Sequence, residues 1–223
     1  MEENMTQYHK IQSLYKRSED GKRMLFGQYS MEEFEYLKDN VWEFSEKVDG
    51  TNIRVIVQDG NITFGGKTDN AQIPAKLVAR LEAMFLAEPH KSNLLAKMPE
   101  GVLYGEGFGA GIQKVGRNYA PYVNFCLFDV NCGGWWLRRD DVHDIGAALG
   151  LQVAPLIANG TLAEMECLVR NGFLSNWGPF PAEGLVARPM VELKTRAGHR
   201  IITKLKTRDF ATKTTAEQAL ASN

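Results

Sequence analysis

The chain has 223 residues, of which 44% are hydrophobic, so it is long enough to bury a sizeable core. Its 26 basic and 27 acidic residues nearly cancel, so any affinity for nucleic acid must come from a local patch. Three cysteines without a Cys-x-x-Cys pair argue against a zinc ribbon or a disulfide framework, and no apolar run reaches the roughly 18 residues of a membrane span. We therefore expect a cytoplasmic protein with no membrane partner.

Predicted strands and helices follow one another irregularly along the chain. Apolar residues at helical spacing predict a helix over residues 73–85. Acidic residues at its start and Gly150 after its end predict a second helix over Asp140–Leu149, and a third is predicted from about Leu162 to Arg170. The irregular order favours an α+β fold with mostly antiparallel sheets flanked by helices. The predicted strands are Trp42–Lys47, Asn52–Gln58, Ile62–Gly66, Val102–Gly107, Val123–Val130, Gly184–Arg188 and Arg200–Leu205.

No linker or repeat interrupts these elements, so we expect a single domain over residues 1–223. In this interpretation residues 1–40 form an N-terminal extension that packs on the domain, and residues 207–223 form a short C-terminal tail with room for one helix.

The segment from Glu46 to Asn52, with the sequence EKVDGTN, joins two apolar strands and allows two interpretations. In the simpler one, Asp49 and Gly50 form a tight hairpin turn beside an exposed lysine. In the other, Lys47 is a nucleophile at a rigid strand end, with a carboxylate two residues away and a glycine that allows a phosphate to approach. Because a free lysine has a pKa near 10.4, making the neutral amine at pH 7 costs about 4 to 5 kcal/mol. Neighbouring cations or a metal ion would have to supply most of that free energy.

A local excess of positive charge follows near the C-terminus. Lys204 and Lys206 share one face of a predicted strand because side chains alternate along a strand, so both could meet one phosphate. An ordinary solvated strand face is the alternative. From Arg188 to Lys213 basic residues far outnumber acidic ones, and we expect nucleic-acid binding through this stretch to weaken with salt.

Three further segments carry residues that suit a nucleotide site. Glu106 stands among glycines, which let a ligand approach the backbone closely, and Glu183 precedes a short apolar strand. Phe128 lies in a buried strand, where its ring could belong to the core or stack on a base. Each signal is weak alone.

Taken together, these segments resemble the motifs of the polynucleotide ligase and mRNA capping enzyme superfamily. The chain is most similar within it to the nick-sealing RNA ligases of phages and of kinetoplastid RNA editing. In order, the matching segments are Lys47-Val48-Asp49-Gly50-Thr51-Asn52, Gly65-Gly66-Lys67-Thr68, Tyr104-Gly105-Glu106, Leu127-Phe128-Asp129, Glu183-Gly184-Leu185-Val186 and Lys204-Leu205-Lys206.

The resemblance implies a nucleotidyltransferase (adenylyltransferase) domain of the ATP-grasp-like ligase type, with ATP and Mg²⁺ or Mn²⁺ as cofactors. Lys47 would attack the α-phosphate of ATP and carry AMP, with Lys204 and Lys206 on that phosphate. Binding roles would fall to Glu183 and Asp49 for the metal ion, Glu106 for the ribose, Phe128 and Glu46 for adenine, and Asn52 and Lys67 for the phosphate of AMP or of a nucleic-acid end.

The partners that the resemblance implies are RNA or a nicked duplex with 5′-phosphate and 3′-hydroxyl ends, and a separate end-healing or nucleic-acid-binding protein is a further candidate. We expect an enzyme encoded by a phage or a bacterium. Residues 207–223 are too few for a C-terminal OB fold, so none is expected. A DNA ligase, a capping-type guanylyltransferase using the same lysine, and a non-catalytic binder of nucleic-acid ends are the alternatives.

Overall fold

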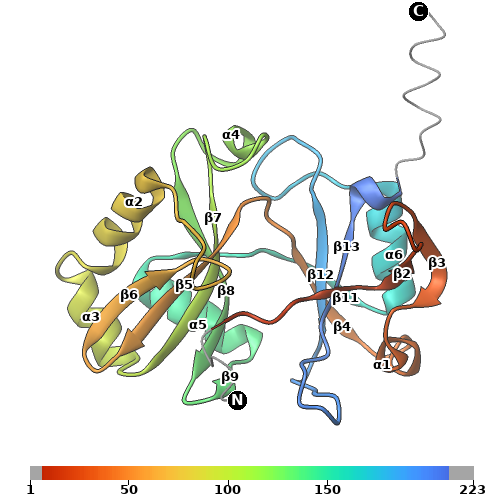
Figure 1. The fold of residues 1–223 in the computed structure, drawn as a ribbon, viewed down its shortest axis with the longest axis horizontal. Helices are drawn as coiled ribbons and strands as arrows, with labels where there is room; N and C mark the ends of the chain where they lie inside the picture. Colours follow the sequence, from red (N-terminus) through yellow and green to blue (C-terminus); the bar gives the residue numbers. More distant parts are fainter. Residues whose placement is uncertain (1–6, 211–223) are drawn as a thin grey trace, which may run out of the picture. The chain divides into compact units, whose positions relative to one another are not determined.

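The computed structural model describes residues 7–210, which form two compact units (Figure 1). The first unit contains residues 7–10 and Val48–Pro155, and the second contains Ile11–Lys47 and residues 156–210. The chain therefore passes between the units after Lys10, after Lys47 and after Pro155.

The first unit is built on a six-stranded sheet with the order β10-β8-β7-β5-β6, and β9 pairs with β8 at its side. All pairings are antiparallel except that of β10 with β8. The Asp59-Gly60 turn joins β5 and β6, and both residues have the positive φ that a tight hairpin needs. The strands are β5 (Thr51–Gln58), β6 (Asn61–Gly65), β7 (Gly101–Phe108), β8 (Asn124–Cys132), β9 (Trp135–Trp136) and β10 (Gln152–Val153).

Helices α2 (Ala75–Phe85), α3 (His90–Lys97) and α5 (Arg139–Leu149) pack on one face of this sheet, and α4 (Gly116–Tyr119) is a single turn. The apolar stripe of α2 that contains Leu77 and Leu81 meets alternate strand residues such as Ile53. Because side chains alternate along a strand, the intervening residues of β5 and β7 project from the opposite face.

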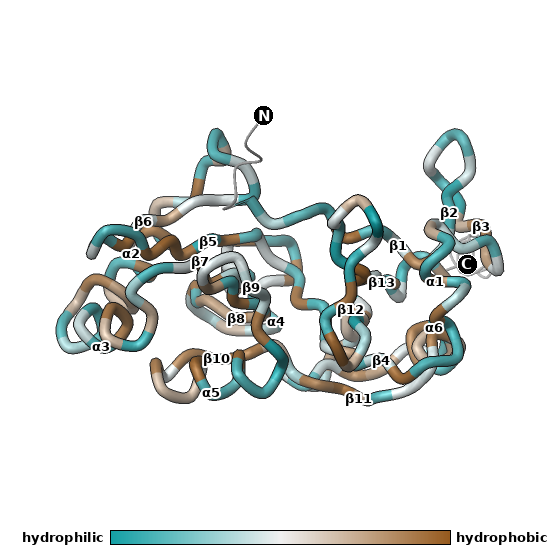
Figure 2. Tube along the Cα trace, turned by 90° about the horizontal axis from the view of Figure 1, so that it is seen from below, coloured by the Kyte–Doolittle hydropathy of each residue, from teal (hydrophilic) through white to brown (hydrophobic). Residues whose placement is uncertain are grey.

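The second unit is built on a five-stranded sheet with the order β1-β13-β12-β4-β11, antiparallel except for the pair of β1 with β13. Figure 2 shows the hydrophobic stretch of β12 in brown and the hydrophilic turn between β2 and β3 in teal. The strands are β1 (Gln12–Ser13), β4 (Trp42–Glu46), β11 (Leu156–Gly160), β12 (Gly184–Pro189) and β13 (Thr203–Lys206), and the separate hairpin is β2 (Tyr15–Arg17) with β3 (Met24–Tyr29).

Helix α6 (Leu162–Asn171) covers one face of that sheet, and α1 (Glu32–Tyr36) adds Phe34 to the same core. A capping box between Thr161 and Glu164 begins α6. The 3₁₀ turn Thr207–Asp209 follows β13.

The predicted α+β class, with mostly antiparallel sheets and flanking helices, is confirmed, and the seven predicted strands and three predicted helices are present. The hairpin interpretation of Asp49-Gly50 is wrong, because β4 and β5 belong to different sheets. The single-domain organisation stays a prediction, and most of the expected C-terminal tail, residues 211–223, lies outside the described residues.

Candidate active site

Lys47 is held by a carboxylate that also holds a second lysine. Its Nζ lies 2.7 Å from Oε2 of Glu183, and Nζ of Lys206 lies 2.6 Å from Oε1 of the same side chain. All three side chains are only partly exposed, between 15% and 20%, which strengthens the attraction relative to bulk water. Glu183 therefore fixes the two ammonium groups on either side of one carboxylate.

The arrangement follows from strand register. Gly184 on β12 is the register partner of Lys206 on β13, and its carbonyl accepts a 2.9 Å hydrogen bond from the backbone N–H of Lys47. Gly184 thus lies between Lys47 and Lys206 across the neighbouring strands, and it has no side chain that would stand between theirs. It has φ of 153°, and a Cβ there would lie 2.1 Å from the carbonyl oxygen of Leu205. Only glycine fits this close pairing of β12 and β13.

Lys204 projects from the same face of β13 as Lys206, because two residues separate them. Its register partner is Val186, which in turn pairs with Ser45 of β4. The core face of these strands instead carries Phe44, Leu185 and Leu205. The two lysines therefore lie on the sheet face that α6 leaves uncovered.

Glu46 is buried beside Lys47 and serves the fold of the second unit. Its carboxylate accepts hydrogen bonds from the hydroxyl of Ser175 and, at 2.8 Å, from the backbone N–H of Asn176. It also shares the face of Trp42 and Phe44 by strand alternation. Its suggested part in reading adenine stays a prediction.

In the first unit, Asn52 and Glu106 lie side by side on adjacent strands. They are register partners on β5 and β7, and both project from the face away from α2 and α5. Oδ1 of Asn52 is buried without a hydrogen-bond partner among the described residues. Because a buried polar atom is costly when unpaired, this atom is suited to a hydroxyl or amine of a bound ligand.

Phe128 occupies an irregular position in β8. Leu127 pairs with Gly105 and Asp129 with Tyr104, which leaves Phe128 as the extra residue of a β-bulge. Its side chain is half-buried, unlike the fully buried Phe125, which belongs to the helix-covered core. A ring presented in this way is available to stack on a base.

Asp49 and Gly50 lie just after the point, at Val48, where the chain returns to the first unit. The backbone N–H of Asp49 donates to the hydroxyl of Tyr119 at 3.3 Å. A Cβ at Gly50 would lie 2.3 Å from the carbonyl oxygen of Gly107 and 2.7 Å from Cγ of Glu106. In this structure, therefore, the absence of a side chain at Gly50 allows its backbone to lie close to β7.

Lys67 lies on an exposed loop that a buried arginine holds in place. Arg54 is 1% exposed, and its Nε donates to the carbonyl of Gly66 at 2.7 Å while Nη2 contacts Oδ1 of Asp69 at 2.8 Å. Nothing in the sequence marks Arg54 as different from a strand-surface cation. Its place between Gly66 and Asp69 shows that it anchors both sides of Lys67.

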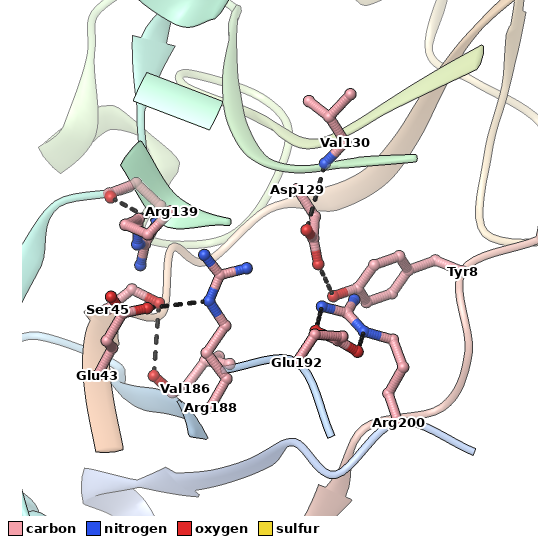
Figure 3. A network of polar contacts seen from close by, with 11 residues as sticks. Tyr8, Glu43, Ser45, Asp129, Val130, Arg139, Val186, Arg188, Glu192 and Arg200 are labelled. Atoms are coloured by element: carbon pink, nitrogen blue, oxygen red, sulfur yellow. Dashed lines mark hydrogen bonds and ion pairs between the residues drawn. The ribbon is translucent and has the colours of Figure 1, made fainter. Parts of the chain in front are cut away.

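Tyr8 is a second residue that sequence reasoning missed. Its hydroxyl donates to Oδ2 of Asp129 at 2.9 Å (Figure 3), and its ring lies 5.1 Å from that of Phe128 and 5.0 Å from that of Tyr104. The N-terminal segment therefore reaches the sheet face that carries Phe128. No local pattern could indicate this contact, since 121 residues separate Tyr8 from Asp129.

The basic stretch that begins at Arg188 is partly neutralised within its own unit. Arg188 on β12 forms a 3.1 Å ion pair with Glu43 on the neighbouring strand β4. Arg200 donates two hydrogen bonds, of 2.5 and 2.7 Å, to the carboxylate of Glu192 (Figure 3). These arginines stabilise the fold of the second unit. The cations left to attract nucleic acid are fewer than the sequence suggests, and Lys213 lies outside the described residues.

The carboxylates suit a metal ion that is bound largely through its substrate. Within residues 7–210 no group of three or more His, Cys, Asp or Glu side chains could hold a metal ion. Glu183 and Asp49 belong to different units. Mg²⁺ commonly uses only one or two carboxylates together with water and substrate phosphates, and Glu183, which already binds two cations, fits such a role. None of the helices described in residues 7–210 has the length and hydropathy of a membrane-spanning segment.

Comparison with known proteins places the chain in a family. A search of curated proteins finds no match to it. Among solved structures it is similar to the RNA ligase of Naegleria gruberi: to a mutant with ATP and manganese (TM-score 0.69, 14% identity, 93% of this chain and 58% of that one), and to the protein with pyrophosphate (0.69, 14%, 97% and 59%).

The chain spans less than two thirds of the length of that ligase, and at this identity the likeness shows the fold. The model of the RNA ligase family matches residues 40–206, which contain the lysines, the carboxylates and the phenylalanine described above. The chain therefore belongs to the RNA ligase family.

Proposed function

We propose that this protein is an ATP-dependent RNA ligase that forms a lysyl-AMP intermediate at Lys47, transfers AMP to a 5′-phosphate and joins that end to a 3′-hydroxyl. The observation that carries the proposal is the contact of Glu183 with both Lys47 and Lys206. It brings a candidate nucleophile and a cation for the reacting phosphate to one carboxylate.

In the first step, the Nζ of Lys47 attacks the α-phosphorus of ATP, the bond to the β-phosphate oxygen breaks, and pyrophosphate leaves with the electron pair. The amine gives its proton to solvent. Lys206 and Lys204, on the same sheet face, stabilise the negative charge that develops on the α-phosphate oxygens. Glu183 would hold a divalent cation, which would supply further positive charge beside the phosphate.

The second step uses the same phosphorus atom, and the third step uses the phosphorus of the RNA end. An oxygen of the RNA 5′-phosphate attacks it and releases the amine of Lys47, which leaves AMP joined to the RNA end through a pyrophosphate bond. The 3′-hydroxyl of the second RNA end then attacks the 5′-phosphate, and AMP departs. Because AMP is a far better leaving group than hydroxide, the joining step becomes feasible.

Adenosine would be bound by residues of the first unit. Glu106 would accept hydrogen bonds from the ribose, and Phe128 would stack on adenine. Asn52 would donate from its amide to the phosphate of AMP or of a nucleic-acid end, which leaves its buried Oδ1 for a ribose hydroxyl. Lys67 is assigned to the phosphate of AMP or of a nucleic-acid end, and Asp49 is assigned to the metal ion. The Naegleria structures with ATP and manganese support ATP and a divalent cation as cofactors. Because the cytoplasm contains both, we place the reaction there.

The test is a mass measurement on the protein itself. Incubation with ATP and Mg²⁺ should add the mass of one AMP, and the addition should be absent from Lys47→Ala and present in Lys16→Ala, whose lysine lies on the exposed hairpin. GTP in place of ATP separates a guanylyltransferase from a ligase. A folded wild-type protein that gains no nucleotide would rule out the proposal. Nicked duplexes with RNA or DNA on the 3′-hydroxyl side then identify the acceptor.

A further inference from the structure

A hydrophilic cavity of about 560 Å³ lies beside the lysines of β13, within the second unit. Five cationic side chains line it: Arg17, Lys22, Lys204, Lys206 and Arg208. Asp209 is the carboxylate among the lining residues, so the lining carries a clear excess of positive charge. Lys204 and Lys206 make the cavity continuous with the candidate active site.

Part of this charge is already used within the protein. Arg17 contacts Oδ1 of Asp209 at 2.8 Å, and Lys206 contacts Glu183. Lys22 and Arg208 are exposed, and neither forms an ion pair within residues 7–210. Two cations at the cavity wall are thus available to an incoming anion.

The cavity is held by ordered structure. The Arg17–Asp209 ion pair ties the β2–β3 hairpin to the 3₁₀ turn that carries Arg208. Asp209 also accepts a 3.3 Å hydrogen bond from the backbone N–H of Lys206 at the end of β13. The hydrophilic turn that carries Lys22 extends from the hairpin (Figure 2). Two of the cations thus sit on segments that Asp209 joins to β13.

We infer that Lys22 and Arg208 form a phosphate-binding extension of the active site, which holds phosphate groups beyond the one at Lys204 and Lys206. Phosphate oxygens accept charge-assisted hydrogen bonds from both side chains, and the guanidinium can bind two oxygens at once. The volume of about 560 Å³ leaves room for more than one phosphate group. The assignment of the ligand rests on the proposed function.

Two sources offer this chemistry. One is the β- and γ-phosphates of ATP, which leave as pyrophosphate. The other is the phosphate backbone of the RNA end. Their shared feature is a run of neighbouring phosphates, and an experiment on binding can separate them.

The double variant Lys22→Ala/Arg208→Ala tests the inference against Lys16→Ala/Arg23→Ala, which removes the same charge from exposed positions outside the cavity. Calorimetric titrations use inorganic pyrophosphate with Mg²⁺, and separately a 5′-phosphorylated RNA oligonucleotide. The cavity variant should lose at least about 10-fold in affinity for one of these ligands, since hydrogen bonds to charged groups typically contribute that much. The control variant should stay close to wild type.

The pattern of loss identifies the source. A loss for pyrophosphate alone assigns the cavity to the nucleotide, and a loss for RNA alone, with a salt dependence reduced by about one ion per cation removed, assigns it to the backbone. Loss for both supports a site that the two ligands share. Equal affinities of the two variants for both ligands, or a wild type that binds neither, would overturn the inference.

These titrations do not depend on formation of lysyl-AMP. A wild type that binds through the cavity but never gains AMP would contradict the ligase proposal and leave the phosphate site in place. A wild type that gains AMP while the cavity variant binds both ligands normally would do the reverse.

Discussion

Glu183 contacts two lysines at once, so its charge does more than balance a single partner. Its Oε2 contacts Nζ of Lys47 at 2.7 Å, and an ammonium group held in an ion pair has no lone pair for attack on phosphorus. A cation that takes over the carboxylate would release Lys47 from this contact. In the proposed reaction, Glu183 would therefore link metal binding to the release of Lys47 for attack.

Glu183→Gln should lower the rate of AMP addition by at least about 10-fold and weaken the apparent affinity for Mg²⁺, because the neutral amide keeps the shape but not the charge. Rates measured across a Mg²⁺ titration would show both effects. Glu192→Gln is the control, since it removes a carboxylate that binds Arg200 in the same unit. An unchanged rate and Mg²⁺ dependence in Glu183→Gln would contradict the assigned role.

Arg54→Met should lower the free energy of unfolding by about 2 kcal/mol or more, because it removes a buried cation and its hydrogen bond to Gly66. Asp69→Asn should cost less, since Asp69 is half exposed and Arg54 keeps the bond to Gly66. Urea denaturation of both variants checks this order. If Asp69→Asn were the more damaging change, Arg54 would not be the anchor of the loop.

At the residue scale, the sequence indicated Lys47, Lys204, Lys206 and Glu183 through their local patterns, and the structure brings Lys47, Lys206 and Glu183 into contact. It could not indicate that Phe128 lies in a bulge, because a bulge depends on the register between two strands. Nor could it separate Arg54 from an ordinary surface cation, since burial of alternate strand residues depends on what covers each face.

Strands β12 and β13 pair Gly184 with Lys206, and Gly184 also accepts a hydrogen bond from the backbone N–H of Lys47. Their backbones approach closely at Gly184, where a Cβ would meet the Leu205 carbonyl and lie 2.8 Å from Cα of Lys206. Because these are backbone atoms of the neighbouring strand, they cannot move without parting the two strands.

Gly184→Ala should therefore cost about 2 to 4 kcal/mol of stability and reduce AMP addition in the protein that stays folded. Gly198→Ala is a matched control with φ of 84° and open space around it, so it should cost only about 1 kcal/mol for the strained backbone. Chemical denaturation measures both variants. Equal costs would show that backbone strain alone matters at Gly184.

The capping box of α6 gives the second unit a pH dependence. Hydrogen bonds from the backbone N–H and the hydroxyl of Thr161 lower the pKa of Glu164 below its ordinary value. A lowered pKa means that the folded state favours the carboxylate. The stabilisation is therefore complete above the ordinary pKa of a glutamate and is lost as the pH falls through the lowered value.

Glu164→Gln should consequently lose less stability than the wild type on acidification below about pH 5, because the amide does not titrate. Thermal unfolding of both proteins between pH 7 and pH 3 follows the difference. Curves that stay parallel over this range would show that the capping box contributes nothing to the acid sensitivity.

At the element scale, long apolar segments were predictable and short polar ones were not. Strands β1 and β2 and helix α4 have two to four residues each, too few for any periodicity to show. Helix α1 buries a single apolar side chain, Phe34, and so has no repeating stripe. The Asp49-Gly50 pair has the composition of a hairpin turn, yet the strands on either side of it find partners elsewhere in the chain.

For the whole molecule, net charge is a poor guide to binding. The sum of charges is near zero, while the cavity beside β13 is lined by five cations and one carboxylate. Composition cannot show this, because Arg17 and Lys22 come from the start of the chain and Arg208 from its end. Conversely, Arg188 and Arg200 look available in the sequence but are held by Glu43 and Glu192.

Every strand of the six-stranded sheet lies between Thr51 and Val153, whereas the five-stranded sheet needs segments from both ends of the chain, β1 at Gln12–Ser13 and β13 at Thr203–Lys206. A ribosome releases the N-terminal part first, so the strands of the first sheet emerge before β12 and β13 are synthesised. Lys47 is made early, and Glu183 and Lys206 come more than a hundred residues later. A nascent chain therefore carries Lys47 before the carboxylate that contacts it, and the second lysine on that carboxylate, have been synthesised.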